Sequence, residues 1–266
     1  MKLFLKIIKI FISSLLFVYI LGLVFLIFFW NKEERFLVAE HSQGSLFSQT
    51  MFDILKFQYP DYSDVYFEQS VAFNKYGHHD KGFELLDQAV DLDPKMHLGY
   101  RGYMKLRFLR DYDGALQDFN TLDSLTPNFN DSPWGENIDF LRGECYYGNK
   151  DYQKAINCFE RNIKSQTESW ADIQSFVYLG IYEYELGNFT KAKTDLNRAL
   201  MQSDKTPEAY FYLAKTFKAM DSIPQAMENT IKAKVNFAYK RDDGYNEYLN
   251  EIYLLDIIEL EKQLTE

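Results

Sequence analysis

Few residues of this chain have the types and spacing that catalysis or metal binding requires. The sequence contains four histidines, and two of them stand beside an aspartate in His78-His79-Asp80. A zinc site needs three or four such ligands converging at short range. This stretch supplies too few ligands, so we predict solvated turn residues here and no metal site.

Two thiols, Cys145 and Cys158, are too few for a disulfide framework or a cysteine-based metal site. They lie on two consecutive predicted helices and could meet there, so a disulfide is the alternative outside the cytoplasm. We predict two separate buried thiols. The sequence contains no glycine-rich phosphate loop, nucleophile elbow or HExxH motif. These observations predict a protein that is not an enzyme and needs no cofactor.

The composition limits the fold and the class of partner. Of the 266 residues, 47% are hydrophobic and 17% are aromatic, so the chain can bury a substantial core. Only 13 glycines and 6 prolines are present, which argues against the many tight turns of a β-barrel or sandwich. The formal net charge is -10, without basic clusters, so nucleic acid is not an expected partner.

The amino end is a long apolar segment. Residues 10–30 read IFISSLLFVYILGLVFLIFFW and carry no charge. In a helix they cover about 30 Å, the thickness of the hydrocarbon core of a membrane. Residues 1–30 therefore predict a short basic amino terminus and a transmembrane signal anchor. The alternative is a cleaved signal peptide, but its apolar region is normally shorter and is followed by small residues.

The charges beside this segment predict its orientation. Lys2, Lys6 and Lys9 precede it, whereas Lys32 and Arg35 follow it together with two glutamates. Positive charge favours the cytoplasmic side, so we expect a cytoplasmic amino terminus and an extracytoplasmic remainder. That remainder would be periplasmic in a Gram-negative bacterium. The alternative is an organelle outer membrane with the remainder in the cytosol.

A short pattern recurs along the rest of the chain. GNKDYQKAINCFERNI (148–163) and GNFTKAKTDLNRAL (187–200) share a polar turn, an aromatic residue, Lys-Ala and an apolar residue four places later. Alignment on that alanine gives a ladder at Gly82, Ala115, Ala155, Ala192 and Ala226. The steps are 33, 40, 37 and 34 residues. A period in the thirties made of two helical stretches predicts an all-α solenoid.

Each step of the ladder carries signals for two helices. Four residues before the ladder position stand His78, Asp111, Asp151, Asn188 and Ser222. Four of these five are preferred N-cap types. Twelve residues before it stand the small residues Gly143, Gly180 and Ala214 in the later copies. Small residues let two helix axes approach closely, so the pattern predicts tightly packed helix pairs.

These motifs resemble the tetratricopeptide repeat, a helix–turn–helix unit of about 34 residues. VYFEQSVAFNKYGHHDKGFELLDQAVDLDP (65–94) matches from its aromatic residue to its closing Asp-Pro, and the second copy has one extra residue before its turn. The later copies lack the closing proline in register, and the fifth has Thr230 at a large apolar position. The resemblance implies a right-handed α-α superhelix of five repeats, at about 63–94, 95–127, 136–165, 173–202 and 207–237. Residues 31–60 would be a linker and a degenerate half-repeat.

The resemblance also implies a concave face, lined by the first helix of each repeat, that binds extended peptides or helices. Carried onto this sequence, the family's groove positions are Phe67, Asn74, Tyr100, Tyr103, Phe140, Glu144, Tyr147, Tyr178, Ile181, Tyr184, Phe211, Tyr212 and Lys215. Nine of these thirteen residues are aromatic, a type favoured in binding hot spots. The alternative is that some of these rings simply pack between adjacent first helices. We also expect Tyr178 and Tyr184 to be replaceable together by alanine without loss of folding.

Two junctions and the carboxyl end depart from the period. Residues 128–137 and 165–172 lengthen two junctions, as surface loops or as partner contacts through Trp134 and Trp170. The apolar spacing after Gly244 predicts an amphipathic helix, and residues 238–266 would cap the last repeat. This helix could instead dock on a second copy of the protein.

The sequence as a whole predicts a single-pass membrane protein without catalytic activity. It would act as a scaffold that binds a protein or peptide partner in the aromatic groove. The alternative is a structural or self-associating subunit of an envelope complex, as a homo-oligomer.

Overall fold

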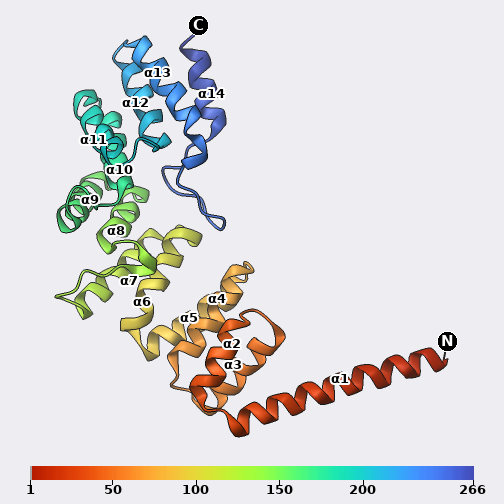
Figure 1. The fold of residues 1–266 in the computed structure, drawn as a ribbon. Helices are drawn as coiled ribbons and strands as arrows, with labels where there is room; N and C mark the ends of the chain where they lie inside the picture. Colours follow the sequence, from red (N-terminus) through yellow and green to blue (C-terminus); the bar gives the residue numbers. More distant parts are fainter. Residues whose placement is uncertain (1) are drawn as a thin grey trace. The chain divides into compact units, whose positions relative to one another are not determined.

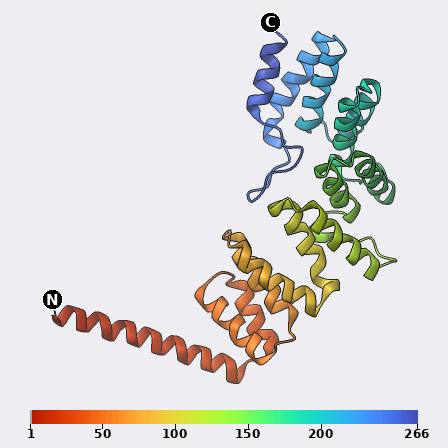
Figure 2. The same ribbon diagram turned by 180° about the vertical axis from the view of Figure 1, so that it is seen from behind.

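The computed structural model describes residues 2–266, with side chains from Phe4 onward. It contains fourteen α-helices, and residues 2–266 contain no β-strand, which confirms the predicted all-α class. The chain divides into two compact units, Met1–His97 and Leu98–Glu266. Figures 1 and 2 show the helices from opposite sides, coloured along the sequence.

The first unit contains five complete helices and the beginning of a sixth. They are α1 (Lys2–Phe29), α2 (Lys32–His41), α3 (Leu46–Gln58), α4 (Ser63–Lys75), α5 (His79–Leu92) and the start of α6 (Pro94–Met104). α2 pairs with α3 and α4 pairs with α5, so two helix pairs follow α1. A small core of Ala39, Met51, Phe52, Leu55 and Val65 joins α2, α3 and the start of α4.

The first of these helix pairs differs from the sequence expectation, because part of the predicted linker is helical. Asn31 caps α2 by accepting a hydrogen bond from the Glu34 amide at 2.9 Å, and the Glu34 carboxylate accepts one from the Asn31 amide at 3.0 Å. Arg35 is buried and donates to Gln58 Oε1 at 2.6 Å, across to the end of α3. The capping box starts a new helix directly after α1, and α2 buries one face against α3.

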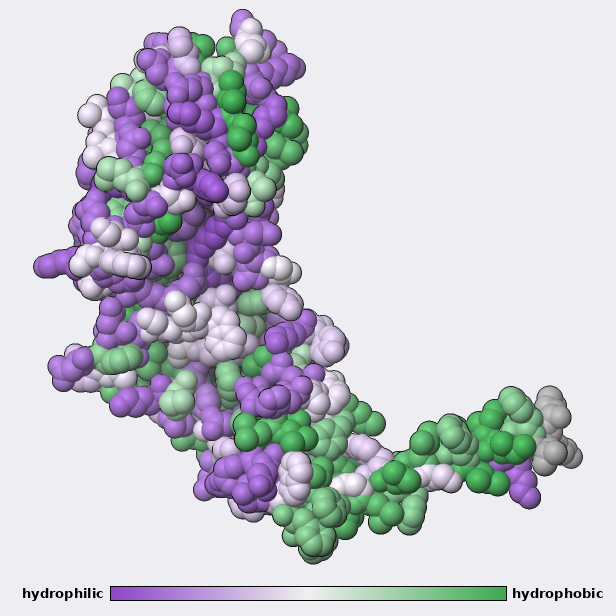
Figure 3. Space-filling model, in the orientation of Figure 1, coloured by the Kyte–Doolittle hydropathy of each residue, from purple (hydrophilic) through white to green (hydrophobic). Residues whose placement is uncertain are grey.

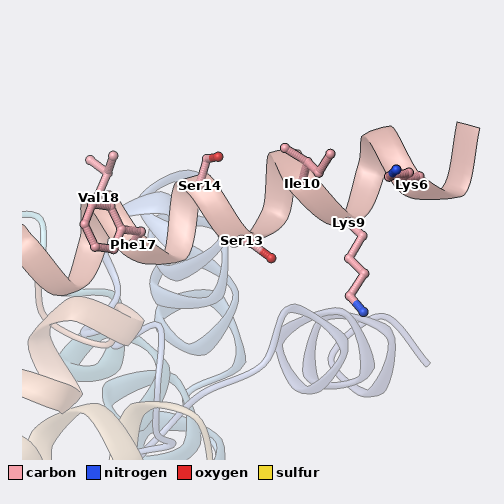
Figure 4. A pocket seen from close by; sticks show the side chains of 7 residues that line it. All are labelled: Lys6, Lys9, Ile10, Ser13, Ser14, Phe17 and Val18. Atoms are coloured by element: carbon pink, nitrogen blue, oxygen red, sulfur yellow. The ribbon is translucent and has the colours of Figure 1, made fainter. Parts of the chain in front are cut away.

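α1 is the one helix among residues 2–266 that is long and apolar enough to cross a membrane, over Phe4–Phe29. Most of its described side chains are exposed, Leu23 and Leu26 near its end pack partly against the core of α2 and α3, and Figure 3 shows apolar surface along most of its length. Figure 4 shows a shallow hollow whose lining side chains, between Lys6 and Val18, all project from α1. A hollow with walls from one helix is a space between neighbouring side chains and cannot enclose a ligand.

The second unit continues with helix pairs. Its elements are the end of α6, a π-helical turn η1 (Lys105–Leu109), α7 (Tyr112–Leu125), the 3₁₀ turn η2 (Pro133–Gly135), α8 (Ile138–Gly148), α9 (Tyr152–Gln166), α10 (Ile173–Glu185), α11 (Phe189–Gln202), α12 (Pro207–Ala219), α13 (Ile223–Val235), the 3₁₀ turn η3 (Phe237–Tyr239) and α14 (Leu254–Gln263). The pairs are α6 with α7, α8 with α9, α10 with α11 and α12 with α13.

The helices of each pair approach closely where the sequence places small residues. A Cβ on Gly143 would lie 2.5 Å from the Phe159 ring, and one on Gly180 would lie 2.4 Å from Leu196 Cγ. Phe159 and Leu196 are the large apolar residues four places after ladder alanines, and both are buried. The repeated pattern is therefore the packing contact within each pair.

The predicted N-caps behave unequally. Asp111 accepts a hydrogen bond from the Gly114 amide at 3.0 Å, and Asp151 accepts one from the Lys154 amide at 3.4 Å. Asn188 accepts no such bond, and its side-chain nitrogen Nδ2 donates to Glu183 Oε2 at 2.8 Å. Capping residue types thus locate these helix starts even where their side chains bond elsewhere.

The carboxyl end differs most from the sequence expectation. The predicted helix over residues 238–266 is confined to α14, and residues 240–253, here called the strap, are not helical. Both ribbon views show the strap reaching back from α13 toward earlier helices of the second unit. Gly244 and the neighbouring aspartates and asparagines favour helix formation weakly, and tertiary hydrogen bonds of the strap compete with it.

Candidate functional site

The thirteen predicted groove residues divide between the two units. Phe67 and Asn74 lie on α4 in the first unit, and the other eleven lie on the first helices α6, α8, α10 and α12 of the second. The Phe67 ring stacks on His97 with centroids 5.1 Å apart. Asn74 is buried against Gly82, where a Cβ would lie 2.0 Å from the Asn74 Oδ1. Both residues therefore pack within the first unit.

Most of the predicted residues of the second unit are buried. Seven of the eleven are at most 8% exposed: Tyr100, Tyr103, Phe140, Glu144, Tyr178, Ile181 and Phe211. Tyr178 is 1% exposed and stacks on Phe159 at 4.9 Å with the rings almost parallel. Its hydroxyl donates to Glu144 Oε1 at 2.9 Å. These side chains form the wall between neighbouring helix pairs.

Four predicted residues keep partly exposed surfaces and form what we call the open patch: Tyr147, Tyr184, Tyr212 and Lys215. They come from three successive first helices, α8, α10 and α12. Lys215 Nζ lies 4.8 Å from the ring centroids of both Tyr184 and Tyr212. Burial lowers the pKa of Lys215, and the charges of Glu185 and Asp256 oppose this shift. The open patch is an aromatic surface with one cation held over its rings.

Beside this patch lies a cluster of four charges, here called the charge cluster, in which Arg107 and Glu144 are buried and Glu136 and Arg241 are partly buried. Glu144 is 0% exposed. It forms a salt bridge with Arg107 and accepts from Arg241 Nη1 at 2.9 Å. Glu136 accepts from Arg107 Nη2 at 2.6 Å and also pairs with Arg241. Two guanidiniums thus meet two carboxylates.

Arg107 reaches the charge cluster from η1, the π-helical turn at the end of α6. The sequence has one extra residue before this turn of the second repeat, and the structure accommodates it as η1, followed by Arg110 with φ 55°. Single π-turns inside helices are frequent at functional sites. The extra residue therefore marks in the sequence the turn that contains Arg107. The repeat pattern does not indicate that Arg107 binds two carboxylates.

Arg241 reaches the cluster from the strap, 97 residues after Glu144. Its guanidinium lies 3.6 Å from the Tyr248 ring centroid and 5.0 Å from that of Phe140. Its backbone amide donates to Glu208 Oε1 at 2.7 Å. Sequence reasoning identified Glu144 and Phe140 but missed Arg107, Glu136, Arg241 and Tyr248, because none of these four occupies a groove position of the family.

The arginines control the ionisation of Glu144. Burial alone raises the pKa of a carboxyl group. Here the positive charges of Arg107 and Arg241, together with their hydrogen bonds, outweigh burial and lower the pKa of Glu144 to about 2. Glu144 is therefore ionised in the folded protein at neutral pH.

This shift predicts a component of acid instability. Because the pKa of Glu144 is lower in the folded than in the unfolded chain, its contribution to the free energy of unfolding is fully present above about pH 4.5. The contribution falls as the pH drops toward 2, by about 3 kcal/mol in all. Chemical denaturation of wild type and Glu144→Gln at several pH values should show the stability gap between them shrinking over this range. A gap that stays constant would contradict the assigned pairing.

The remaining candidates for chemistry do not combine into a site. Cys145 and Cys158 are both free and buried, and burial raises the pKa of Cys145 well above its usual value. Residues 2–266 contain no group of three His, Cys, Asp or Glu side chains placed to hold a metal ion. His78 is exposed in the turn before α5.

The two junction tryptophans differ in their surroundings. Trp134 is 56% exposed, and its ring lies 4.7 Å from that of Tyr100. Trp170 is 81% exposed and lines a hollow beside the strap, together with Lys205, Tyr239 and Arg241. Contact of either tryptophan with a partner stays a prediction.

Comparison with known proteins identifies one repeat by its sequence. A family model described as "Tetratricopeptide repeat" matches residues 140–167, which span α8 and α9. Among curated proteins no sequence match is found.

Solved structures share the fold at low sequence identity. PilW, a widely conserved type IV pilus biogenesis factor, has a TM-score of 0.61 and 14% identity, covering 78% of this chain and 94% of PilW. YrrB, a TPR protein with an unusual peptide-binding site, has a TM-score of 0.54 and 13% identity, covering 79% of this chain and 97% of YrrB. MamA from Desulfovibrio magneticus has a TM-score of 0.55 and 17% identity, covering 68% of this chain and 97% of the MamA chain. Residues 140–167 thus match a tetratricopeptide repeat, and most of the chain shares the fold of these solved structures, a succession of helix pairs.

Proposed function

We propose that the protein is a membrane-anchored scaffold without catalytic activity, which holds a protein or peptide partner on the first-helix face of its second unit. The observation that carries the proposal is the open patch, in which partly exposed Tyr147, Tyr184, Tyr212 and Lys215 share one face of three successive first helices. Aromatic side chains offer large contact areas and lose little rotamer entropy on binding. A similar fold in a protein with a peptide-binding site, YrrB, supports this class of function.

The anchor in this proposal is α1. It is apolar over Phe4–Phe29, and most of its described side chains are exposed, which suits a helix surrounded by lipid. Lys2, Lys6 and Lys9 at its amino end support a cytoplasmic amino terminus and extracytoplasmic repeats. The asymmetry is small, because Lys32 and Arg35 follow the helix.

Co-purification tests the scaffold and identifies its partner. The protein would be tagged after Glu266, solubilised from native membranes in mild detergent, and compared with Tyr184→Ala by mass spectrometry. Loss of a hot-spot tyrosine costs about 2 kcal/mol of binding free energy, so we expect at least a tenfold loss of the partner. In cells whose outer layers are permeabilised while the anchoring membrane stays sealed, added protease should remove the tag if the repeats are extracytoplasmic.

A matched control uses Tyr76→Ala, because Tyr76 is 71% exposed, belongs to the first unit and is not a residue of the open patch. This variant should retain the partner as wild type does. Equal retention by a folded Tyr184→Ala variant would contradict the proposal. Capture of the protein's own copies alone would favour the self-associating alternative, for which α14 offers the exposed Leu255 and Ile258.

A further inference from the structure

The strap lies on the first-helix face of the second unit in the manner of a bound extended peptide. At its start, the Arg241 amide donates to Glu208 on α12. In its middle, the Glu247 carbonyl accepts from Arg110 beside η1. Near its end, Asn250 Nδ2 donates to Gln174 Oε1 on α10 at 2.6 Å. The strap thus uses main-chain and side-chain hydrogen bonds to the second, fourth and fifth repeats.

Arg241 is the strap residue with the most specific contacts. Its two terminal nitrogens bind two different carboxylates, Glu144 and Glu136, and its guanidinium plane lies against the Tyr248 ring. Two-pronged binding to carboxylates combined with stacking on an aromatic ring is a geometry that arginine satisfies and lysine does not.

The charge balance of the cluster explains why a positive side chain is needed at this position. With Arg241 present, the charge cluster is neutral, because its two carboxylates face two guanidiniums. Without Arg241, Arg107 alone faces Glu136 and the fully buried Glu144. A buried carboxylate that lacks sufficient counter-charge is costly, so the vacated position attracts another guanidinium. The net charge of -10 on the whole chain favours a basic partner in the same way.

The strap can leave this face without removing the cap of the last repeat. α14 is held by an apolar cluster in which its Ile257 and Leu260 pack with Ala226 and Ala233 of α13, and Ile252 at the end of the strap joins the same cluster. The tip of the strap, around Gly244 and Tyr245, is exposed. Departure of residues 240–250 therefore disrupts the contacts of Arg241, Glu247 and Asn250 and the packing of Leu249 on the core of the second unit, and leaves the cluster of α14 intact.

We infer that the first-helix face of the second unit is a recognition site for an extended peptide bearing an arginine and a nearby aromatic residue, and that the strap is its internal competitor. This inference rests on the proposed scaffold function and specifies the chemistry of the partner. The strap itself supplies the template, with Arg241 as the guanidinium and Tyr248 as the ring. A partner segment of this type would take the place of the strap.

A peptide in place of the strap tests the inference. The probe is a fluorescent synthetic peptide with the sequence of residues 240–253, KRDDGYNEYLNEIY, added to the detergent-solubilised full chain. In wild type the tethered strap acts at an effective concentration of about millimolar and excludes the probe. In Arg241→Ala the tethered strap is weakened, so we expect fluorescence anisotropy to report binding at least about tenfold tighter than in wild type.

Controls separate arginine recognition from general loosening. A peptide with alanine in place of its arginine should bind Arg241→Ala at least about tenfold more weakly than the native sequence does. Arg161→Ala removes an arginine of α9 whose exposed side chain pairs with Asp139, and this variant should exclude the probe as wild type does. If circular dichroism shows that Arg241→Ala does not fold, Arg241→Lys, which keeps the charge and loses the two-pronged geometry, takes its place.

A folded variant that binds neither peptide, or binds both equally, would overturn the inference and leave the strap as a fixed part of the cap. The scaffold proposal fails separately, because its test is retention of a native partner by Tyr184→Ala. Loss of that partner without peptide binding would retain the scaffold and reject arginine recognition.

Discussion

Replacing Glu144 by alanine is expected to lower the free energy of unfolding by about 3–5 kcal/mol, because it leaves buried arginine charge without its partner. Glu144 is 0% exposed and contacts Arg107, Arg241 and the Tyr178 hydroxyl. After its removal, Glu136 alone faces both guanidiniums. Urea denaturation followed by circular dichroism measures the change in stability.

The control for this substitution is a surface pair of the same chemistry. Glu168 and Arg198 are 2.6 Å apart, and Glu168 is 53% exposed. Glu168→Ala should cost between 0 and about 1 kcal/mol, because water solvates exposed charges. If Glu144→Ala were as mild as Glu168→Ala, the charge cluster would not be a buried network in solution.

Replacing Tyr178 by alanine is expected to lower the free energy of unfolding by about 3–5 kcal/mol, which is the usual cost of removing a large buried aromatic side chain. Its ring contacts Phe159, and the rings of Tyr147 and Phe140 lie 4.9 Å and 6.2 Å away. The expectation that Tyr178 and Tyr184 can be removed together without loss of folding stays untested, and the burial of Tyr178 argues against it. Tyr178 fills the space between neighbouring helix pairs, so its side chain serves packing rather than an open binding surface. Urea denaturation followed by circular dichroism is again the measurement.

Two further variants separate the causes of this cost. Tyr178→Phe keeps the ring and removes only the hydroxyl that donates to Glu144 at 2.9 Å, so it should cost about 1.5–3 kcal/mol. Tyr184→Ala removes a partly exposed ring and should cost less than Tyr178→Ala. Equal destabilisation by the Tyr178→Ala and Tyr184→Ala variants would show that Tyr178 does not have the packing role described here.

Both predictions concern side chains that serve the fold and the proposed binding face together. Tyr178 and Arg241 share one carboxylate oxygen, Glu144 Oε1, so packing within the wall is coupled to the position of the strap. A partner that replaced Arg241 with its own arginine would keep this oxygen paired. Substitutions in the charge cluster therefore need a stability measurement before any binding result is interpreted, whereas Tyr184 is better suited to a binding test.

The sequence by itself predicted the helix pairs of the repeats, because their signals are local. Gly143 and Phe159 are sixteen residues apart in one pair, and each pair repeats the same contact with its own small and large residues. The apolar character of α1 could also be recognised from composition alone. These features depend on short-range spacing, which a single sequence records directly.

Only the tertiary structure decided which groove residues are open and what covers them. Burial of Tyr178, and partial exposure of Tyr184, depend on how neighbouring repeats stack, and both residues occupy groove positions of the family. The pairing of Arg241 with Glu144 joins residues 97 positions apart, and no periodic pattern specifies a contact at that separation. The apolar spacing after Gly244 predicted a helix, but the contacts of Arg241 and Asn250 with the first helices hold residues 240–253 in a non-helical strap. Local sequence preferences determine the helix pairs of the repeats, whereas long-range electrostatic and hydrogen-bond contacts determine the non-helical conformation of the strap.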